Sequence, residues 1–189
     1  RQEIDNYLLR LPNILHDSVP YGKDDKSNVT IRKWGVAKKP KFDLKAHGDI
    51  IEMIEIGDFT KATEVSGAGF YYMFGKLAQL NLALMQFAVD ALVKKGFVLT
   101  IPPLMLRRKP YEGVTDLADF EKVMYKVENE DLYLIATSEH SIATYFMNET
   151  IPVEKLPIKI AGFSPCFRKE IGSHGVDTRG LFRTHQFWK

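Results

Sequence analysis

The sequence has a single cysteine, Cys166, among its 189 residues. One cysteine cannot form an internal disulfide, and it cannot supply the cysteine cluster of a zinc site. His174 and His185 have no third ligand at a metal-like spacing, so we expect no metal site made of protein ligands. The lack of a disulfide framework is typical of a reducing compartment, which predicts a cytoplasmic protein.

Long apolar runs and a strong net charge are also absent. No apolar stretch approaches the roughly 20 residues that a membrane-spanning helix needs, so we expect no membrane partner. The net charge of +2 is too small to indicate a nucleic-acid partner by itself. Apolar residues make up 45% of the chain, which is enough for a sizeable core in one domain with an appendage.

The last 27 residues carry the pattern that is most informative about function. Residues 163–170 and 181–189 read as two strands joined by a long glycine-rich loop. Side chains alternate between the two faces of a strand. One face of this hairpin therefore combines two arginines, a carboxylate, an imidazole and an aromatic ring: Arg168, Glu170, Arg183, His185 and Phe187.

If Glu170 lies opposite Leu181, then Arg168 lies opposite Arg183. Opposed like charges destabilise a sheet unless an anion lies between them. Guanidinium groups bind phosphates well, a ring such as Phe187 can stack on a base, and a carboxylate can accept from an exocyclic amine. This register predicts a nucleoside triphosphate site, whereas the alternative is a hairpin with a solvated basic face.

Several segments resemble the class II aminoacyl-tRNA synthetases, and in detail the seryl-tRNA synthetases. The stretches FRKE at 167–170, DTRGLFR at 177–183 and HQF at 185–187 resemble motif 2 of that class. TSE at 137–139 resembles the serine-binding loop of the family, and a helix predicted from Thr137 to about Met147 begins there. The segments YEGVTDL, ATSEH and GVDTRGLFR are most similar to those of archaeal members.

The resemblance implies an α+β fold, the class II catalytic fold, with a mainly antiparallel sheet flanked by helices. Apolar periodicity predicts a helix over residues 76–95 that ends at Gly96, followed by a strand over 97–101. With the prolines that follow, these segments resemble motif 1 of the family, which implies a homodimer. Residues 122–127 and 131–136 alternate like a strand pair. Gly69 stands where the family usually has an arginine.

Two regions are expected along the chain. Residues 1–27 resemble the remnant of the N-terminal helical arm and its linker, beginning with a helix over residues 1–11 that has no cap. Residues 28–189 resemble the catalytic core with motifs 1 and 2 but without motif 3. The family glutamate that recognises the serine hydroxyl would also fall beyond Lys189. We therefore expect a fold truncated before motif 3 and an active site that is incomplete and impaired.

The resemblance implies ATP-dependent activation of L-serine to seryl-adenylate, and then transfer of the seryl group to tRNA(Ser). Arg168 and Arg183 would be catalytic, with Arg168 bridging the α-phosphate and the serine carboxylate. Mg²⁺ would bridge the phosphates of ATP. The implied ATP site comprises Arg168, Lys169, Glu170, Arg183, Thr184 and Phe187. The implied serine site comprises Thr137, Ser138, Glu139 and Arg168.

Other interpretations remain open at this point. Thr137 to Glu139 could simply start a helix, with Ser138 as its cap and Glu139 in the favourable first turn. The chain could be a non-catalytic ATP- or protein-binding fragment of a synthetase. It could also be an amino acid:carrier-protein ligase, a class that resembles seryl-tRNA synthetases but uses a zinc site. Cys166 is expected to be a small core residue.

Overall fold

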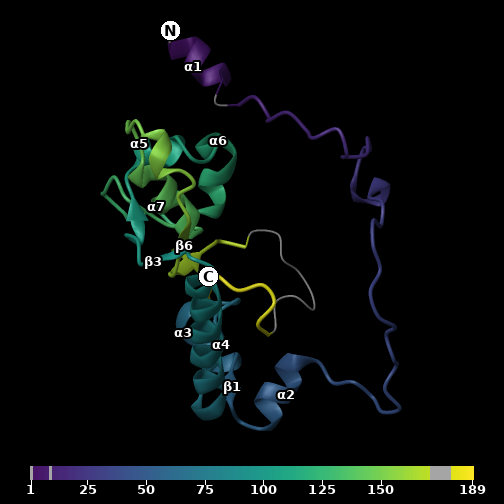
Figure 1. Ribbon diagram of the computed structural model, residues 1–189. Coiled ribbons are helices and arrows are strands. Elements are labelled where there is room, and N and C mark those ends of the chain that lie inside the picture. The colour runs from purple at the N-terminus through teal and green to yellow at the C-terminus, as the bar shows by residue number, and fades with distance from the viewer. Residues whose placement is uncertain (1, 9, 171–179) are drawn as a thin grey trace. The chain divides into compact units, whose positions relative to one another are not determined.

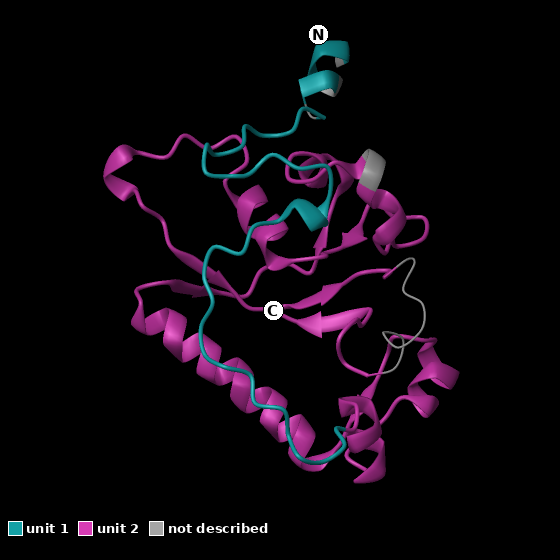
Figure 2. Ribbon diagram, turned by 90° about the vertical axis from the view of Figure 1, so that its right-hand side faces the viewer, with its two compact units in different colours: residues 1–44 teal, residues 45–189 magenta. Residues whose placement is uncertain are grey.

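The computed structural model describes residues 2–8, 10–170 and 180–189. It divides the chain into two units, residues 1–44 and residues 45–189 (Figure 2). Unit 1 contains helix α1 (Gln2–Leu8) and the 3-10 turn η1 (Asp25–Ser27). The predicted N-terminal helix is therefore shorter than residues 1–11. The predicted boundary after residue 27 lies inside unit 1 and stays a prediction.

Unit 2 alternates short strands with helices along the chain, as the colours of Figure 1 show. Its elements are α2 (His47–Met53), β1 (Gly57–Asp58), α3 (Thr60–Ser66), β2 (Tyr72–Met73), α4 (Gly75–Lys94), β3 (Val98–Thr100), β4 (Met105–Leu106), α5 (Arg108–Glu112), α6 (Leu117–Phe120), η2 (Glu121–Val123), β5 (Tyr133–Leu134), α7 (Ser138–Tyr145), η3 (Val153–Lys155), β6 (Ile160–Gly162), β7 (Pro165–Phe167) and β8 (Gln186–Trp188). None of the helices in the described residues is long and apolar enough to cross a membrane.

The strands pair mainly in the antiparallel sense, as predicted. The pairs β1–β2, β4–β5 and β7–β8 are antiparallel, and β3–β6 is parallel. Further backbone bonds join the pairs. The Phe167 N–H donates to the Ile135 carbonyl at 2.9 Å, and the His185 N–H donates to the Gly69 carbonyl at 2.9 Å. The hairpin β7–β8 is thereby linked to β5 on one side and to the segment before β2 on the other.

The register of that hairpin differs from the predicted one by two residues. Phe167 pairs with Gln186, and the Arg168 N–H donates to the His185 carbonyl at 3.0 Å. Arg168 therefore lies beside His185 and not opposite Arg183, so the predicted repulsion between the two arginines is wrong. A shift of two residues keeps every side chain on its predicted face, which is why alternation alone could not detect it.

The predicted long helix is confirmed as α4, with Gly96 just after it at a φ of +81°. The helix packs against β3 and β6, yet none of its residues is buried. Large apolar side chains stay exposed on it, including Phe87 at 73%. The cover that so apolar a helix needs is therefore not supplied by the described residues.

The predicted strand pair over 122–127 and 131–136 forms only in part. Residues Glu121–Val123 make the 3-10 turn η2, and the named strand β5 is limited to Tyr133–Leu134. Two ladder bonds, from the Val127 N–H to the Leu132 carbonyl and from the Leu134 N–H to the Tyr125 carbonyl, are both 2.9 Å long. At the start of the segment, the Tyr133 hydroxyl donates to the Glu121 carboxylate of the turn at 2.6 Å.

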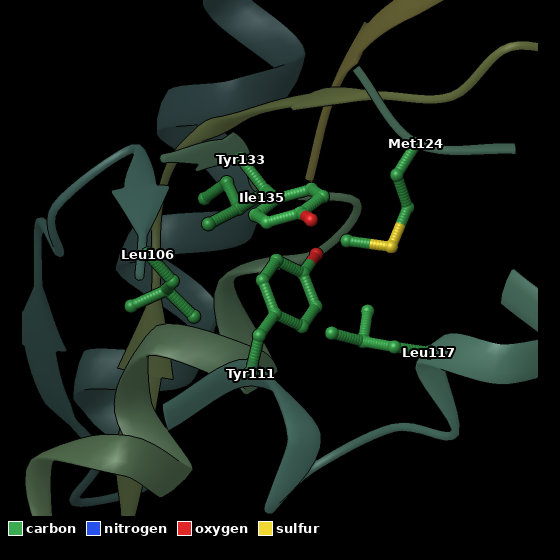
Figure 3. Close-up of a cluster of buried hydrophobic side chains, with 6 residues drawn as sticks. All are labelled: Leu106, Tyr111, Leu117, Met124, Tyr133 and Ile135. Carbon is green, nitrogen blue, oxygen red and sulfur yellow. The ribbon is translucent and has the colours of Figure 1, made fainter. Parts of the chain in front are cut away.

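A buried cluster lies between β4, α5, α6 and β5 and supports the site described below. It consists of Leu106, Tyr111, Leu117, Met124, Tyr133 and Ile135. In Figure 3 the Tyr111 ring lies between Leu106 and Leu117, with Ile135 above it. Tyr111, Tyr133 and Ile135 are 0% exposed, so apolar burial is most complete here. Cys166 is also buried, as predicted for a core residue.

Candidate active site

The two predicted ends of the amino-acid site, Arg168 and Glu139, line the same cavity of about 420 Å³. We call it the Arg168–Glu139 cavity. Its other walls come from α6, the turn η2, β5 and α7. The lining residues are Thr115, Phe120, Val123, Met124, Ala136, Thr137, Glu139, His140, Arg168 and Glu170.

Thr137 directly precedes α7, whose first two residues are Ser138 and Glu139, and the predicted helix start is confirmed. The N-cap is Thr137 and not Ser138, and no side chain makes a cap hydrogen bond. Capping therefore does not account for these residues. Thr137 and Glu139 face the cavity, whereas Ser138 is buried and packs against Gly162 of β6. The structure brings two of these three predicted residues to the cavity.

Glu139 is paired with Lys189, which follows β8. The Lys189 ammonium donates to Glu139 Oε1 at 2.9 Å and to Thr137 Oγ1 at 3.0 Å. The Lys189 backbone is itself fixed, because its N–H donates to the Ser164 carbonyl at 3.0 Å. The hydrogen bond from the Lys189 ammonium, together with its positive charge, holds the pKa of Glu139 below its usual value. Glu139 is thus a charged carboxylate already holding an ammonium group.

Arg168 extends from the end of β7 toward β5. Its Nε donates to the Ala136 carbonyl at 3.2 Å, and its guanidinium carbon lies 5.3 Å from the centre of the Phe187 ring. The first contact uses one of five N–H donors, and the second suits a cation over an aromatic face. The orientation of the guanidinium is therefore set by β5 and β8 while the rest of the fork stays open to a bound anion.

Glu170 and Arg183 face each other on the loop side of the hairpin. The Arg183 Nε lies 3.7 Å from Glu170 Oε2, and the Arg183 side chain is 50% exposed. A pair this long, with an arginine this exposed, contributes little to stability. Arg183 can exchange this contact for groups on a ligand at low cost.

The remaining predicted ATP residues do not all share this cavity. Thr184 and Phe187 line a second cavity of about 430 Å³ next to α4 and β6, and Thr184 is buried. The Lys169 ammonium lies 5.5 Å from the centre of the Tyr125 ring and lines neither cavity. Phe187 connects the two cavities through its contact with Arg168. Residues 171–179 of the predicted glycine-rich loop lie outside the described residues.

Sequence reasoning missed a contact at the floor of the cavity, between the buried Tyr111 and His140 of the cavity wall. The Ala136 N–H donates to the Tyr111 hydroxyl at 3.1 Å, and His140 Nδ1 lies 2.9 Å from the same hydroxyl. Burial lowers the pKa of His140 and raises the pKa of Tyr111. The sole sequence signal was the position of His140 directly after Glu139, while Tyr111 lies 25 residues before Ala136.

The charges of the Arg168–Glu139 cavity suit a small zwitterion. A guanidinium comes from the β7 side and a carboxylate comes from the start of α7. An α-amino acid carries the complementary pair, a carboxylate and an ammonium group. The Lys189 ammonium shows that Glu139 and Thr137 together accept hydrogen bonds from an amine.

Comparison with known proteins agrees with this geometry at the level of the class. Residues 123–189 match the tRNA synthetase class II core domain (G, H, P, S and T). Unit 2 combines helices with mainly antiparallel strand pairs, which form four two-stranded sheets. The fold is that of the class II tRNA synthetase core.

Within this class the chain is similar to the serine–tRNA ligases, as its sequence predicted. It is 54% identical over 188 residues to that of Methanocorpusculum labreanum, covering 100% of this chain and 44% of that protein. It is 57% identical over 182 residues to that of Methanoregula boonei, covering 96% of this chain and 43% of that protein. The chain thus spans less than half the length of these relatives.

Two solved structures support the same assignment. The seryl-tRNA synthetase from Pyrococcus horikoshii complexed with ATP has a TM-score of 0.93 and 47% identity, covering 100% of this chain and 46% of that one. The cytoplasmic serine–tRNA ligase from Naegleria fowleri in complex with AMP has a TM-score of 0.88 and 37% identity. This match covers 100% of this chain and 45% of the Naegleria fowleri chain.

Proposed function

We propose that this chain forms the amino-acid-activating site of a serine–tRNA ligase. The observation that carries the proposal is the placement of Arg168 and Glu139 in one cavity of about 420 Å³. Arg168 would bind the serine carboxylate, and Glu139 with Thr137 would bind the serine ammonium. The similarity to serine–tRNA ligases supports serine as the amino acid.

The reaction would join serine to ATP without a general base. A serine carboxylate oxygen forms a bond to the α-phosphorus, and the bond from that phosphorus to the bridging oxygen breaks. Pyrophosphate leaves with the electron pair, and seryl-adenylate remains. Negative charge builds up on the α-phosphoryl oxygens, next to the guanidinium of Arg168. Catalysis would then consist of positioning and charge stabilisation.

ATP would extend from Arg168 along the hairpin face. Phe187 would stack on the adenine, Glu170 would accept from its amine, and Arg183 would hold the outer phosphates. Thr184 and Lys169 would lie beside the nucleotide. Release of its long contact with Glu170 would make the exposed Arg183 available to ATP.

Mg²⁺ would accompany ATP, bound mainly through phosphate oxygens. No group of three His, Cys, Asp or Glu side chains in the described part of the chain gathers to hold a metal. Magnesium commonly binds through substrate phosphates and only a few protein ligands, so a site without such a group of side chains can still hold Mg²⁺ together with ATP. When bound, it would neutralise phosphate charge.

The proposal includes the partners of the complete reaction. The seryl group would pass to tRNA(Ser) in the cytoplasm. The exposed apolar surface of α4 would be covered in a homodimer, with residues 97–103 at the same interface. The exposed Phe87 supports that arrangement, because a 73% exposed ring on a structured helix favours contact with another surface.

Serine-dependent exchange of pyrophosphate into ATP tests the proposal. Arg168→Ala should lower exchange about tenfold to hundredfold, since a hydrogen bond to a charged group contributes about 1.5–3 kcal/mol. Arg107→Ala removes an exposed arginine outside the cavity and serves as the control. Equal exchange in both folded variants would contradict the role of Arg168.

Two further arms separate the other functions. ATP binding without exchange would support a non-catalytic binding fragment. Exchange with loading of a carrier protein but not tRNA(Ser) would support an amino acid:carrier-protein ligase. Exchange followed by loading of tRNA(Ser) supports the proposed function.

A further inference from the structure

Tyr111 has a buried hydroxyl that the proposed reaction does not use. Its side chain is 0% exposed and its ring lies in the buried cluster of Figure 3. A phenylalanine would fill the same apolar space without having to satisfy a polar atom. A buried hydroxyl must find hydrogen-bond partners, so its presence calls for a polar explanation.

The hydroxyl holds two groups at the floor of the Arg168–Glu139 cavity. It accepts from the Ala136 N–H at 3.1 Å and lies 2.9 Å from His140 Nδ1. Because the Ala136 N–H is the donor in the first bond, the hydroxyl proton is available to His140 Nδ1. Burial lowers the pKa of His140, which keeps its imidazole neutral and able to accept that proton.

Ala136 transmits this contact to Arg168. Its N–H is held by Tyr111, and its carbonyl accepts from Arg168 Nε at 3.2 Å. His140 transmits the contact to the other end of the cavity, because it is the neighbour of Glu139 in α7. One hydroxyl is therefore linked to both the guanidinium and the carboxylate through short, mostly backbone connections.

We propose that Tyr111 is a positioning residue, whose buried hydroxyl fixes the separation and orientation of Arg168 and Glu139 for an α-amino acid. This inference rests on the proposed function and adds to it a residue outside the cavity wall. A zwitterion must be held at both ends at once. Small misplacements of such groups are costly, up to about a hundredfold in rate for about 1 Å.

The chain offers a matched control in Tyr133. Both tyrosines are 0% exposed and belong to the same cluster. The Tyr133 hydroxyl instead donates to Glu121 at 2.6 Å and accepts from Arg108 at 3.0 Å. These partners do not line the cavity. Each Tyr→Phe variant removes one satisfied buried hydroxyl and keeps the ring in the core.

The experiment measures serine and ATP dependence of pyrophosphate exchange in Tyr111→Phe and Tyr133→Phe. Tyr111→Phe should raise the KM for serine about tenfold, as expected for a lost buried hydrogen bond with an unsatisfied partner. The KM for ATP should change less than about twofold, and Tyr133→Phe should leave both values near wild type. Equal serine KM values in the two variants would overturn the inference.

An NMR readout keeps the inference testable apart from the reaction, and a second variant covers a failure to fold. The ¹⁵N chemical shifts of His140 report whether Nδ1 accepts a hydrogen bond, and Tyr111→Phe should remove that signature. An unchanged His140 spectrum would overturn the inference even if the wild-type protein showed no exchange, an outcome that would count separately against the proposed function. If Tyr111→Phe does not fold, His140→Leu removes the same bond from its other side. That variant should also raise the serine KM, and an unaltered KM would again refute the inference.

Discussion

Gly69 is the position where one added methyl group should disturb the hairpin most directly. Its φ is +82°, a region that costs an alanine about 1–2 kcal/mol. A Cβ at Gly69 would also lie 2.5 Å from Cδ2 of His185. The His185 ring cannot easily move away, because Tyr125 hydrogen-bonds its Nδ1 and the Phe70 ring lies 5.1 Å from it.

Gly69→Ala should therefore cost more than backbone strain alone. Overpacking of this kind adds about 1–3 kcal/mol, so we expect a total loss of about 2–5 kcal/mol in the free energy of unfolding. Gly96 is the matched control, since its φ is +81° and nothing lies within 4 Å of the added Cβ. Gly96→Ala should cost only the backbone term, about 1–2 kcal/mol.

Urea unfolding of these variants, with and without His185→Ala, measures the difference. Removal of the His185 ring should reduce the cost of Gly69→Ala to that of Gly96→Ala. Equal losses for the two glycine variants in the presence of His185 would refute the close packing of Gly69 on the ring. Equal losses would also mean that contact with the His185 ring is not the reason for a glycine at position 69, where the family usually has an arginine.

Three further predictions concern charge and association. Hydrogen bonds from Tyr133 and then Arg108 lower the pKa of Glu121, so this group stabilises the fold above its unfolded pKa of about 4.3. The stability gap between wild type and Glu121→Gln should thus narrow as pH falls from 7 toward 3, measured by urea unfolding; a constant gap would argue against it. Lys189→Met should raise the pKa of Glu139 toward its usual value in an NMR titration, because the ammonium hydrogen bond that lowers it is lost; an unmoved titration would disprove the pairing. Phe87→Glu should weaken self-association in sedimentation, and a wild-type protein that is monomeric at tens of micromolar would contradict the homodimer.

The sequence predicted the faces of the hairpin but not its register. Alternation places Arg168 and Phe187 on one face in either register, and their contact at 5.3 Å agrees with it. The register itself depends on bonds beyond the hairpin, such as the one from the Phe167 N–H to the Ile135 carbonyl. Partners 32 residues apart leave no periodic signal, so the opposed arginines were a wrong prediction.

The candidate site was predictable to a similar extent. Thr137 and Glu139 of the short motif reach the cavity, and the helix that begins there was correctly predicted. Tyr111 was not predicted, because an isolated tyrosine in a short helix looks like any core residue. Its proposed function depends on a hydroxyl whose partners, Ala136 and His140, are brought close by the packing of α5 against α7.

The structure of the protein bound to a non-hydrolysable seryl-adenylate analogue tests the central claim most directly. The account predicts that the serine ammonium of the analogue lies within hydrogen-bond distance of the Glu139 carboxylate. The linker that replaces the phosphate should contact the Arg168 guanidinium, and the adenine should stack on Phe187. An analogue bound without contact to Arg168 or Glu139 would contradict the account.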